Sequence, residues 1–274
     1  MSQPTPVLVS GGFDNLKSAD LRFLEEAAKL GEVTVLLWSD SLIQRVAGKP
    51  PSFPMAERLY FVQAVRYVNR VVELDALVSP DTLPAHAGLR GGLWADFESP
   101  VNAKRALFCR QNKIDYRVFT AAELSGFPEP PPMPSAPGKK KVLATGCYDW
   151  FHSGHVRFAE EASAYGDLYI CLGNDANVRE LKGEGHPLLS QEERRYVVGS
   201  IKFVKQALIS TGFGWLDADP EIRRIRPDIY VVNEDGDQGG KREYCQKMGL
   251  EYLVLKRNPA PGLPKRSSTK LRGF

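Results

Sequence analysis

The sequence predicts an α/β protein with two tandem Rossmann-like domains, each built on a parallel sheet. Three observations predict this class: short apolar strands alternate with amphipathic helices, the second half of the chain repeats the first, and a proline-rich segment separates the halves. Strands that alternate with helices form parallel sheets with right-handed crossovers. Because ligands bind such sheets at the carboxyl ends of the strands, we expect a functional site at that edge.

The second half shows the alternation in order. Short runs of β-branched and aromatic residues predict strands over 141–146, 168–173, 228–233 and 251–255. Between them, apolar residues spaced by three and four predict helices over 153–165, 191–204 and 241–248. Gly166 closes the first helix as a C-terminal cap, and Ser190 with Glu193 forms a capping box that opens the second.

An internal repeat relates the two halves. With a shift of 135 residues, 11 of 30 positions are identical between GGFDNLKSADLRFLEEAAKLGEVTVLLWSD, which begins at Gly11, and GCYDWFHSGHVRFAEEASAYGDLYICLGND, which begins at Gly146. The match continues at a shift of 136, where ERLYFVQAVRYV aligns with ERRYVVGSIKFV and Cys109 with Cys245. A period this long excludes a solenoid and indicates duplication of a whole domain.

A proline-rich segment, GFPEPPPMPSAPGKK, covers residues 126–140 between the two copies. Proline cannot continue a helix or a central strand, so we expect a semi-rigid linker here, with a long surface loop as the alternative. The predicted organisation is a first domain over 1–125, the linker over 126–140 and a second domain over 141–274.

Composition limits the classes of function. The net charge of +3 is too small to require nucleic acid as a partner, and no apolar run approaches the roughly 20 residues of a membrane helix. The opening MSQPTPVLVSGG has neither the basic nor the apolar region of a signal peptide. The four cysteines form no CxxC pair and indicate reduced thiols. We therefore expect a cytoplasmic protein that binds neither nucleic acid nor membrane.

Two histidines, His152 and His155, flank a Ser-Gly pair where a predicted strand meets a predicted helix. Such a pair can bind a metal ion, bind an anion or complete a core. A metal site needs further ligands, and His86 and His186, the other histidines, lie in no ligand-like motif. The pattern favours an anion, because the first helical turn offers N–H groups and a positive dipole and Gly154 permits close approach to the backbone.

The stretch TGCYDWFHSGHVRFAEEA resembles the signature of the HxGH nucleotidyltransferases, a superfamily of cytidylyltransferases and related adenylyltransferases. That signature is a strand, then G-x-[FY]-D-x-x-H-x-G-H, then a helix, and the matching residues are Gly146, Tyr148, Asp149, His152, Gly154 and His155. A second family signature, rich in serine and threonine, is matched about 110 residues later by RSSTK, which begins at Arg266. The tandem arrangement is similar to that of ethanolamine-phosphate cytidylyltransferase.

The resemblance implies transfer of a nucleoside monophosphate from a nucleoside triphosphate to a phosphorylated acceptor, with release of pyrophosphate. It implies that His152 and His155 hold the triphosphate and stabilise charge during transfer, with Lys182 as a further catalytic cation. The late segment would cap a helix N-terminus that holds the β- and γ-phosphates. Mg²⁺ carried by the triphosphate is the expected cofactor, without a metal site formed by protein ligands alone. The implied nucleotide-binding residues are Gly146, Tyr148, Asp149, Gly154, Arg194, Arg266, Ser268 and Thr269.

Substrate specificity depends on fewer residues. The Ser-Ser-Thr segment is nearer to the cytidylyltransferases, so CTP is the expected donor, with ATP as the alternative. Trp150, Asn233 and Asp237 are candidates for the acceptor site, although simple packing also explains Trp150, and a solvated helix arginine also explains Arg194. The segment NEDGDQGG departs from the shorter G-x-D of many family members. We expect a small polyol, amino-alcohol or sugar phosphate as acceptor.

Three functions are therefore considered. The first is a cytidylyltransferase, and the second is an adenylyltransferase that acts on a sugar phosphate or nucleotide acceptor. The third is a non-catalytic nucleotide-binding regulatory protein, against which the intact HxGH motif argues.

The first copy lacks the residues that carry this chemistry. It has Lys17, Ser18, Ala19 and Asp20 in place of the HSGH sequence, and Ala47 in place of Lys182. A carboxylate at Asp20 would repel a triphosphate in a partly buried site. We therefore expect this domain to be inactive and to act as an intramolecular pseudo-dimer partner of the active one. The alternative is that it binds a different ligand.

Overall fold

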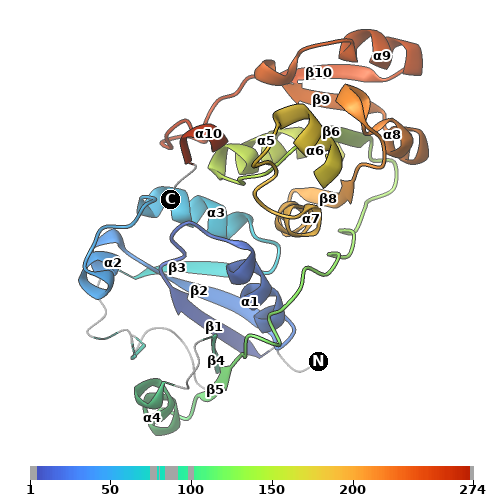
Figure 1. The fold of residues 1–274 in the computed structure, drawn as a ribbon. Coiled ribbons are helices and arrows are strands. Elements are labelled where there is room, and N and C mark those ends of the chain that lie inside the picture. The colour runs from blue at the N-terminus through green and yellow to red at the C-terminus, as the bar shows by residue number, and fades with distance from the viewer. Residues whose placement is uncertain (1–4, 75–78, 80, 84–91, 98–101, 272–274) are drawn as a thin grey trace. The chain divides into compact units, whose positions relative to one another are not determined.

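Each half of the chain folds around one five-stranded parallel sheet (Figure 1). The computed structural model describes residues 5–74, 79, 81–83, 92–97 and 102–271. It divides into two units, Met1–Gly126 and Phe127–Phe274. The predicted α/β, Rossmann-like class is confirmed in both.

The first unit has the strand order β3-β2-β1-β4-β5. Its elements are β1 (Pro6–Gly11), α1 (Ser18–Ala28), β2 (Glu32–Trp38), α2 (Asp40–Ala47), α3 (Met55–Ala64), β3 (Arg70–Leu74), β4 (Leu93–Asp96), α4 (Ala103–Gln111) and β5 (Asp115–Val118). The central strand β1 is apolar, and its residues Val7, Leu8 and Val9 are at most 2% exposed.

The second unit has the strand order β10-β9-β6-β7-β8, which is the same arrangement. Its strands are β6 (Lys141–Gly146), β7 (Asp167–Leu172), β8 (Val204–Ile209), β9 (Ile229–Asn233) and β10 (Glu251–Leu255). Its helices are α5 (Ser153–Ser163), α6 (Asp175–Lys182), α7 (Gln191–Gly199), α8 (Asp219–Ile225), α9 (Lys241–Met248) and α10 (Ser268–Leu271), with 3₁₀ turns η2 (Gly214–Leu216) and η3 (Glu234–Gly236).

Strand register repeats between the units as well as strand order. Pro6 pairs with Glu32 in the first sheet, and Lys141 pairs with Asp167 in the second, which is the same register after the shift of 135. A shared register fixes which side chains face each core. The repeat in the sequence therefore corresponds to a repeat in three dimensions.

The predicted helix over 191–204 is wrong in its second part. Helix α7 ends at Gly199, where the N–H of Ser200 bonds back to the last turn, and Val204 opens β8. The apolar residues that suggested one helix are all buried, but they reach the core from a helix, a turn and a strand in succession: Val197, Val198, Ile201 and Val204.

The first part of the proline-rich segment packs on the second unit. The N–H of Met133 donates to the carbonyl of Lys205 in the edge strand β8 (2.9 Å), and the ring of Phe127 lies 6.1 Å from that of Tyr196. Because edge strands expose unpaired backbone groups, this segment shields β8.

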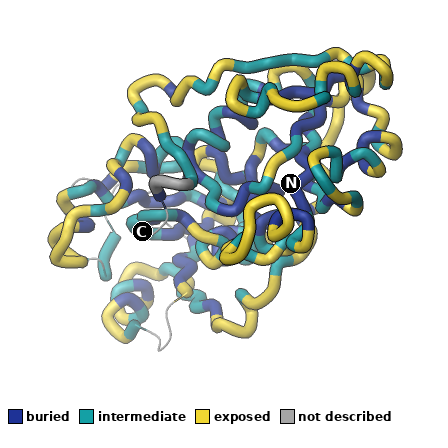
Figure 2. Tube along the Cα trace, turned by 45° about the horizontal axis from the view of Figure 1, so that its top comes forward, coloured by how far each residue is buried: buried dark blue, intermediate teal, exposed yellow. Residues whose placement is uncertain are grey.

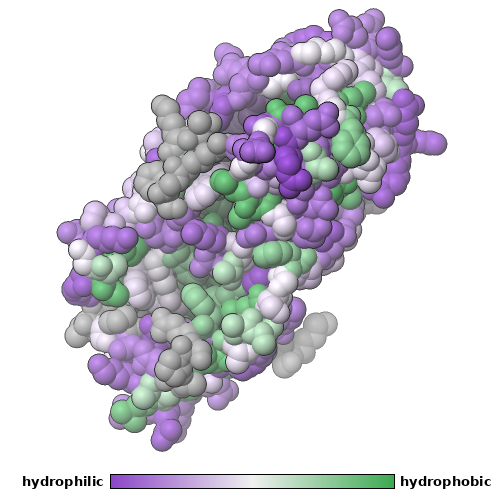
Figure 3. All heavy atoms as spheres, in the orientation of Figure 1, coloured by the Kyte–Doolittle hydropathy of each residue, from purple (hydrophilic) through white to green (hydrophobic). Residues whose placement is uncertain are grey.

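Burial follows the strands. In Figure 2 the buried stretches of the tube lie in the interior, while turns and helix ends are mostly exposed. On the face seen in Figure 3, hydrophilic residues cover much of the second unit's surface, with smaller hydrophobic groups among them. Within the described ranges, no helix combines the length and apolar character needed to cross a membrane.

Candidate active site

The strand order of the second sheet reverses between β6 and β9. Strands β7 and β8 extend the sheet on one side of β6, and β9 and β10 extend it on the other. Ligands bind at the carboxyl end of such a switch point. A cavity of about 170 Å³ opens there, which we call the histidine pocket. Its lining residues are Thr145, Gly146, Cys147, Tyr148, His152, Gly154, His155, Phe158, Val232, Asn233, Asp235, Gly236, Lys241 and Arg257.

A tight turn leads from β6 into this pocket. Tyr148 adopts a left-handed φ of 54°, and its ring folds back over Gly146. A Cβ added to Gly146 would lie 2.8 Å from Cε2 of Tyr148, so only glycine leaves the ring enough room. The first unit repeats this turn with Phe13 (φ 47°) over Gly11. Gly146 and Tyr148 thus shape the turn in the second unit, as Gly11 and Phe13 do in the first.

His152 and His155 are locked together at the start of α5. His152 is the N-cap: its Nδ1 accepts the N–H of Gly154 (3.1 Å), and its own N–H donates to Nδ1 of His155 (3.3 Å). The two rings stack with their centroids 4.0 Å apart. Because each Nδ1 accepts a hydrogen bond, the proton of each neutral ring is assigned to Nε2.

Gly154 makes room for the imidazole of His152. Its N–H is bonded to His152, and a Cβ added to it would lie 2.9 Å from Cε1 of that ring. Gly154 also lines the histidine pocket, so the approach of an anion to its backbone stays a prediction. Glycine is needed here because the imidazole occupies the space of a side chain.

The Nε2 of His152 is buried and has no hydrogen-bond partner among the described residues. Burial, together with the charges of Arg257 and Arg266, lowers the pKa of His152 to about 4. Burial also lowers the pKa of His155, with contributions from His152, Arg257 and Lys182. Both rings are therefore neutral near neutral pH. A buried donor without an acceptor indicates that a ligand supplies one.

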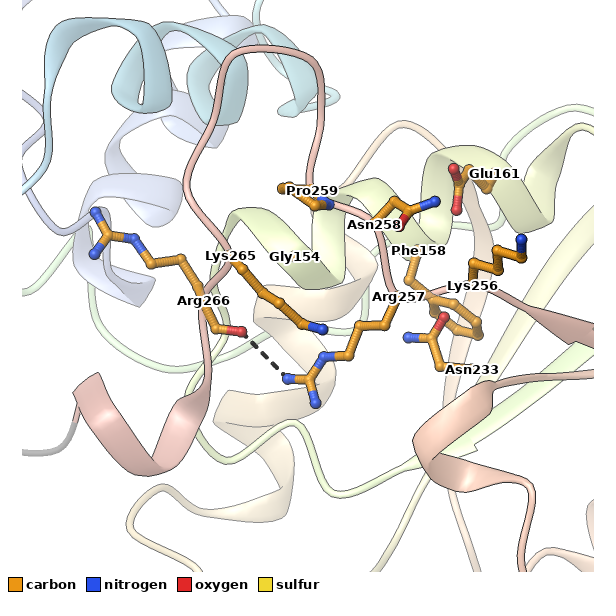
Figure 4. A pocket seen from close by; sticks show the side chains of 10 residues that line it. All are labelled: Gly154, Phe158, Glu161, Asn233, Lys256, Arg257, Asn258, Pro259, Lys265 and Arg266. Carbon is orange, nitrogen blue, oxygen red and sulfur yellow. Dashed lines mark hydrogen bonds between the residues drawn. The ribbon is translucent and has the colours of Figure 1, made fainter.

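A second cavity, which we call the cationic cavity, adjoins the histidine pocket and shares Gly154, Phe158, Asn233 and Arg257 with it. Figure 4 shows that its cations come from two segments, the one that follows β10 and the C-terminal one. Glu161 is the one carboxylate that lines it in the described part of the chain, and it pairs with Arg157 (2.7 Å). The cations are Lys256, Arg257, Lys265 and Arg266.

Arg257 links the two cavities. Its guanidinium pairs with Asp235 and donates to the carbonyl of Arg266 (3.2 Å; dashed line in Figure 4). Lys241, which also lines the histidine pocket, donates to the carbonyl of Gly236 (2.6 Å). We did not predict either cation from the sequence. The sequence feature that could have indicated Arg257 is the Lys-Arg pair directly after β10. Residues that follow a parallel strand lie at the ligand-binding edge of the sheet.

The predicted cation Lys182 lies at the end of α6 and is exposed. Its charge is close enough to lower the pKa of His155, but it is not among the described residues that line either cavity. Ser268, at the start of α10, donates its hydroxyl hydrogen to the carbonyl of Trp150 (3.2 Å). This bond ties the late segment to the loop that carries the histidines. The side chain of Thr269 lies outside the described residues, as does His86.

The structure places Arg194, a predicted nucleotide contact, in the interior and away from the described walls of both cavities. Its side chain is 0% exposed, and its guanidinium has four acceptors within the protein. It pairs with Asp175 (2.6 Å), and it donates to the carbonyls of Cys147, Gly173 and Leu189. Arg194 therefore holds together the loops that surround the pocket.

Asp149 has a similar role. One carboxylate oxygen accepts the N–H groups of Leu188 (2.6 Å) and Leu189 (3.2 Å), and the other lies 3.0 Å from Nδ1 of His186. Both oxygens are thus engaged with the loop before α7. In this structure Asp149 therefore holds the loop before α7, and its contact with the nucleotide stays a prediction.

The three candidates for the acceptor site lie in different surroundings. Asn233, at the end of β9, lines both cavities, and Trp150 is half-buried in the loop. Asp237 bonds to Arg242 (2.5 Å) and Tyr252 (3.0 Å) and is not among the described lining residues of either cavity, so its assignment to the acceptor site stays a prediction. Asp235 is the carboxylate that reaches the pocket. In the described part of the chain, no three His, Cys, Asp or Glu side chains gather to hold a metal ion.

Comparison with known proteins agrees with this site. A family model described as cytidylyltransferase-like matches residues 143–273, within the second unit. The FAD synthase of Ferroglobus placidus is 36% identical over 120 residues, which are 43% of this chain and 75% of that protein. The chain belongs to the cytidylyltransferase-like family of nucleotidyltransferases. The second unit is thus a nucleotidyltransferase domain, as the HxGH resemblance implied.

A longer relative matches over a smaller share of its own length. The bifunctional protein HldE of Aliarcobacter butzleri is 37% identical over 120 residues, 43% of this chain but 24% of that protein. The chain therefore spans about a quarter of that relative. A solved lipopolysaccharide core biosynthesis protein from Thermoplasma volcanium aligns with 45% of this chain and 99% of its own at 21% identity, with a TM-score of 0.38.

Proposed function

We propose that the second unit transfers a nucleoside monophosphate from a nucleoside triphosphate to a small phosphomonoester and releases pyrophosphate. The observation that carries this proposal is the buried Nε2–H of His152, which lacks an acceptor among the described residues and lies beside the cationic cavity. A triphosphate supplies an acceptor for this donor, and its negative charge suits the cations that line the adjoining cavity.

The chemistry needs little covalent participation by the protein. An oxygen of the acceptor phosphate attacks the α-phosphorus, and the bond from that phosphorus to the bridging oxygen breaks as pyrophosphate leaves. Catalysis of such a step consists of alignment and stabilisation of negative charge. His152 and His155 donate from Nε2 to the triphosphate, and the cations of the cationic cavity hold its remaining charge. A general base is unnecessary, because the acceptor phosphate is already ionised at neutral pH.

Mg²⁺ would enter with the triphosphate, as is general in this family. It prefers phosphate oxygens, water and one or two carboxylates over a complete set of protein ligands. Asp235 is the carboxylate that lines the histidine pocket in the described residues, and Arg257 already pairs with it. This arrangement fits a metal ion carried mainly by the phosphates.

Two donors are favoured by different observations. The Ser-Ser-Thr segment favours CTP, as in the sequence prediction. The similarity to an FAD synthase favours ATP, because FAD contains an adenylate joined through a pyrophosphate bond. The expected acceptor remains a small polyol, amino-alcohol or sugar phosphate, and the FAD synthase relative adds riboflavin phosphate to that set.

For the first unit we propose the absence of catalysis. It has Asp20 where the second unit has His155, and its sequence carries no equivalent of the late Ser-Ser-Thr segment. Its role as an intramolecular partner of the catalytic unit stays a prediction.

The test measures pyrophosphate release for each combination of ATP, CTP, GTP and UTP with glycerol phosphate, ethanolamine phosphate, choline phosphate, hexose phosphates and riboflavin phosphate. The His155→Ala variant serves as the blank. Turnover with one pair identifies donor and acceptor together. Nucleotide binding without pyrophosphate release from any pair would contradict the proposal and favour the non-catalytic, regulatory alternative.

A further inference from the structure

The first unit keeps a cavity at its own switch point, between β1 and β4. Its volume is about 190 Å³, close to that of the histidine pocket. We call it the aromatic pocket. Its lining residues are Ser10, Gly11, Gly12, Phe13, Asp20, Phe23, Trp38, Ala95, Asp96, Phe97 and Arg105.

The aromatic pocket corresponds to the histidine pocket position by position. The stretch 10–13 aligns with 145–148, and Asp20 aligns with His155. Across the switch point, Phe97 aligns with Asn233 and Arg105 with Lys241 at the shift of 136. Both copies therefore have a cavity at the same place in the fold, but side chains of different chemistry line it.

Asp20 places an acidic side chain in this wall, where the second unit has the imidazole of His155. One of its carboxylate oxygens accepts the N–H of Lys17 (2.8 Å) as part of the capping box of α1. No ion pair of Asp20 is present in the described part of the chain. Burial raises the pKa of this carboxyl group and outweighs the hydrogen bond and charge of Lys17, which lower it.

The cation that lines the pocket is already neutralised. Arg105 pairs with Asp96, and its Nε lies 3.3 Å from Asp81. The hydroxyl of Tyr116 also donates to Asp96 (3.0 Å). Arg105 is thus committed to two carboxylates. The pocket as a whole carries a negative charge at Asp20 and repels phosphates.

Aromatic rings form much of the remaining wall. Phe23 and Phe97 lie 4.9 Å apart, and Phe13 lies over the turn that follows β1. Trp38 stands where the second unit has Gly173, and its indole N–H donates to the hydroxyl of Ser10 (2.8 Å), which fixes the ring. Aromatic faces attract cations, above all alkylammonium groups that are only weakly hydrated.

We propose that the first unit binds a small organic ammonium ion in the aromatic pocket, with Asp20 as its counter-charge and the surrounding rings as its cage. The ligand site is separate from the nucleotidyl-transfer site and does not depend on the function proposed for the second unit. An anionic nucleotide is excluded from it by the same carboxylate.

The experiment is calorimetry on the full-length chain with choline as the probe. The comparison ligand is the neutral carbon isostere of choline, in which a tert-butyl group replaces the trimethylammonium group. Saturating pyrophosphate and Mg²⁺ are present in parallel titrations, so that a response from the second unit is recognised. We expect saturable choline binding, weaker binding of the neutral isostere by about tenfold, and no change with pyrophosphate.

Two variants locate the site. Asp20→Asn keeps an acceptor for the N–H of Lys17 and removes the charge, so choline affinity should fall about tenfold or more. Phe97→Leu, at a half-exposed ring, should weaken binding while the fold is retained. Glu32→Gln is the matched control, because it removes an exposed carboxylate at the opposite end of β2. Circular dichroism confirms folding of each variant.

Four outcomes would each overturn the proposal. Equal binding of choline and its neutral isostere would overturn the proposal, as would unchanged affinity in Asp20→Asn. Loss of choline binding when pyrophosphate is added would assign the ligand to the second unit and overturn it as well. Absence of saturable binding up to roughly 10 mM would do the same. None of these outcomes requires the second unit to be active.

Discussion

The two units hold the same arginine in the same place. Arg58 pairs with Asp40 (2.6 Å) and donates to three carbonyls around its pocket, and Arg194 does the same with Asp175 (2.6 Å). The acceptor carbonyls correspond one by one: Phe53, Gly12 and Trp38 in the first unit, and Leu189, Cys147 and Gly173 in the second.

A carboxylate is shared in the same way. Asp14 accepts the N–H groups of Ser52 (2.7 Å) and Phe53 (2.9 Å), as Asp149 accepts those of Leu188 and Leu189. The first unit keeps both networks although it lacks the histidine pair. The networks therefore serve the fold of the switch point. The second unit has in addition the histidines and the cations, and to these we assign the proposed chemistry.

The largest expected effect tests the shared arginine. Arg194→Met and Arg58→Met each leave a carboxylate and buried carbonyls without their donor, so each should destabilise its own unit by about 3–5 kcal/mol. Hydrogen exchange at increasing denaturant concentration, followed on peptides from β1–β2 and β6–β7, reports on each unit separately.

An exposed arginine of the second unit provides the control for this pair. Arg223, with a side chain 61% exposed, pairs with Asp219 within α8, and Arg223→Met should leave the free energy of unfolding nearly unchanged. Arg194→Met that kept full stability and lost only nucleotide affinity would restore the nucleotide-contact role and break the comparison between the units.

The next effect tests a residue that the units do not share. His155→Ala should lower kcat/KM for pyrophosphate release by about 10²–10³, because one donor to the developing charge is removed. Asp20→Ala, at the aligned position of the first unit, should leave turnover within about twofold. Similar losses in both variants would mean that the first unit takes part in catalysis, and turnover near wild type in His155→Ala would remove the assigned role.

The sequence predicted those parts of the site that depend on local patterns. The strand-turn-helix context located His152 and His155, and the internal repeat anticipated both sheets. Long-range contacts were not predictable in this way. Arg257 reaches the histidine pocket from the loop after β10, and no periodicity links it to the HxGH motif.

The buried position of Arg194 was difficult to predict for a different reason. The position of an arginine in a helix does not reveal whether its side chain points into the protein interior. The sequence alone therefore does not distinguish a buried structural arginine from one that contacts a nucleotide. The repeat held the missing information: Arg58 occupies the aligned position in a copy without the histidines. A residue shared with an inactive copy is better explained by the fold.

Arg257 provides a third, smaller test. Arg257→Gln should raise KM for the nucleoside triphosphate about tenfold or more, because a hydrogen bond to a charged group contributes about 1.5–3 kcal/mol. Arg242→Gln is the matched control: its side chain is 62% exposed, and it pairs with Asp237 away from the described walls of both cavities. Equal increases in KM from steady-state kinetics of the two variants would indicate a general effect of charge and would argue against phosphate binding by Arg257.

The smallest expected difference between the units is their response to acid. Because the folded-state pKa of His152 is lowered to about 4, the unfolded chain binds the proton first, and the second unit loses stability as the pH falls from about 6.5 toward 4. The slope contributed by one histidine is at most about 1.4 kcal/mol per pH unit. The pKa of Asp20 is raised, so this residue contributes the opposite sign, and the first unit gains stability as the pH falls through that pKa.

Hydrogen exchange at about pH 7 and pH 5, corrected for the intrinsic rate, should therefore show a pH dependence of the second unit that His152→Asn reduces and Asp20→Asn leaves unchanged. If His152→Asn left that dependence intact, the imidazole would not be buried as a neutral donor, and the distinction between the two pockets would lose its electrostatic basis.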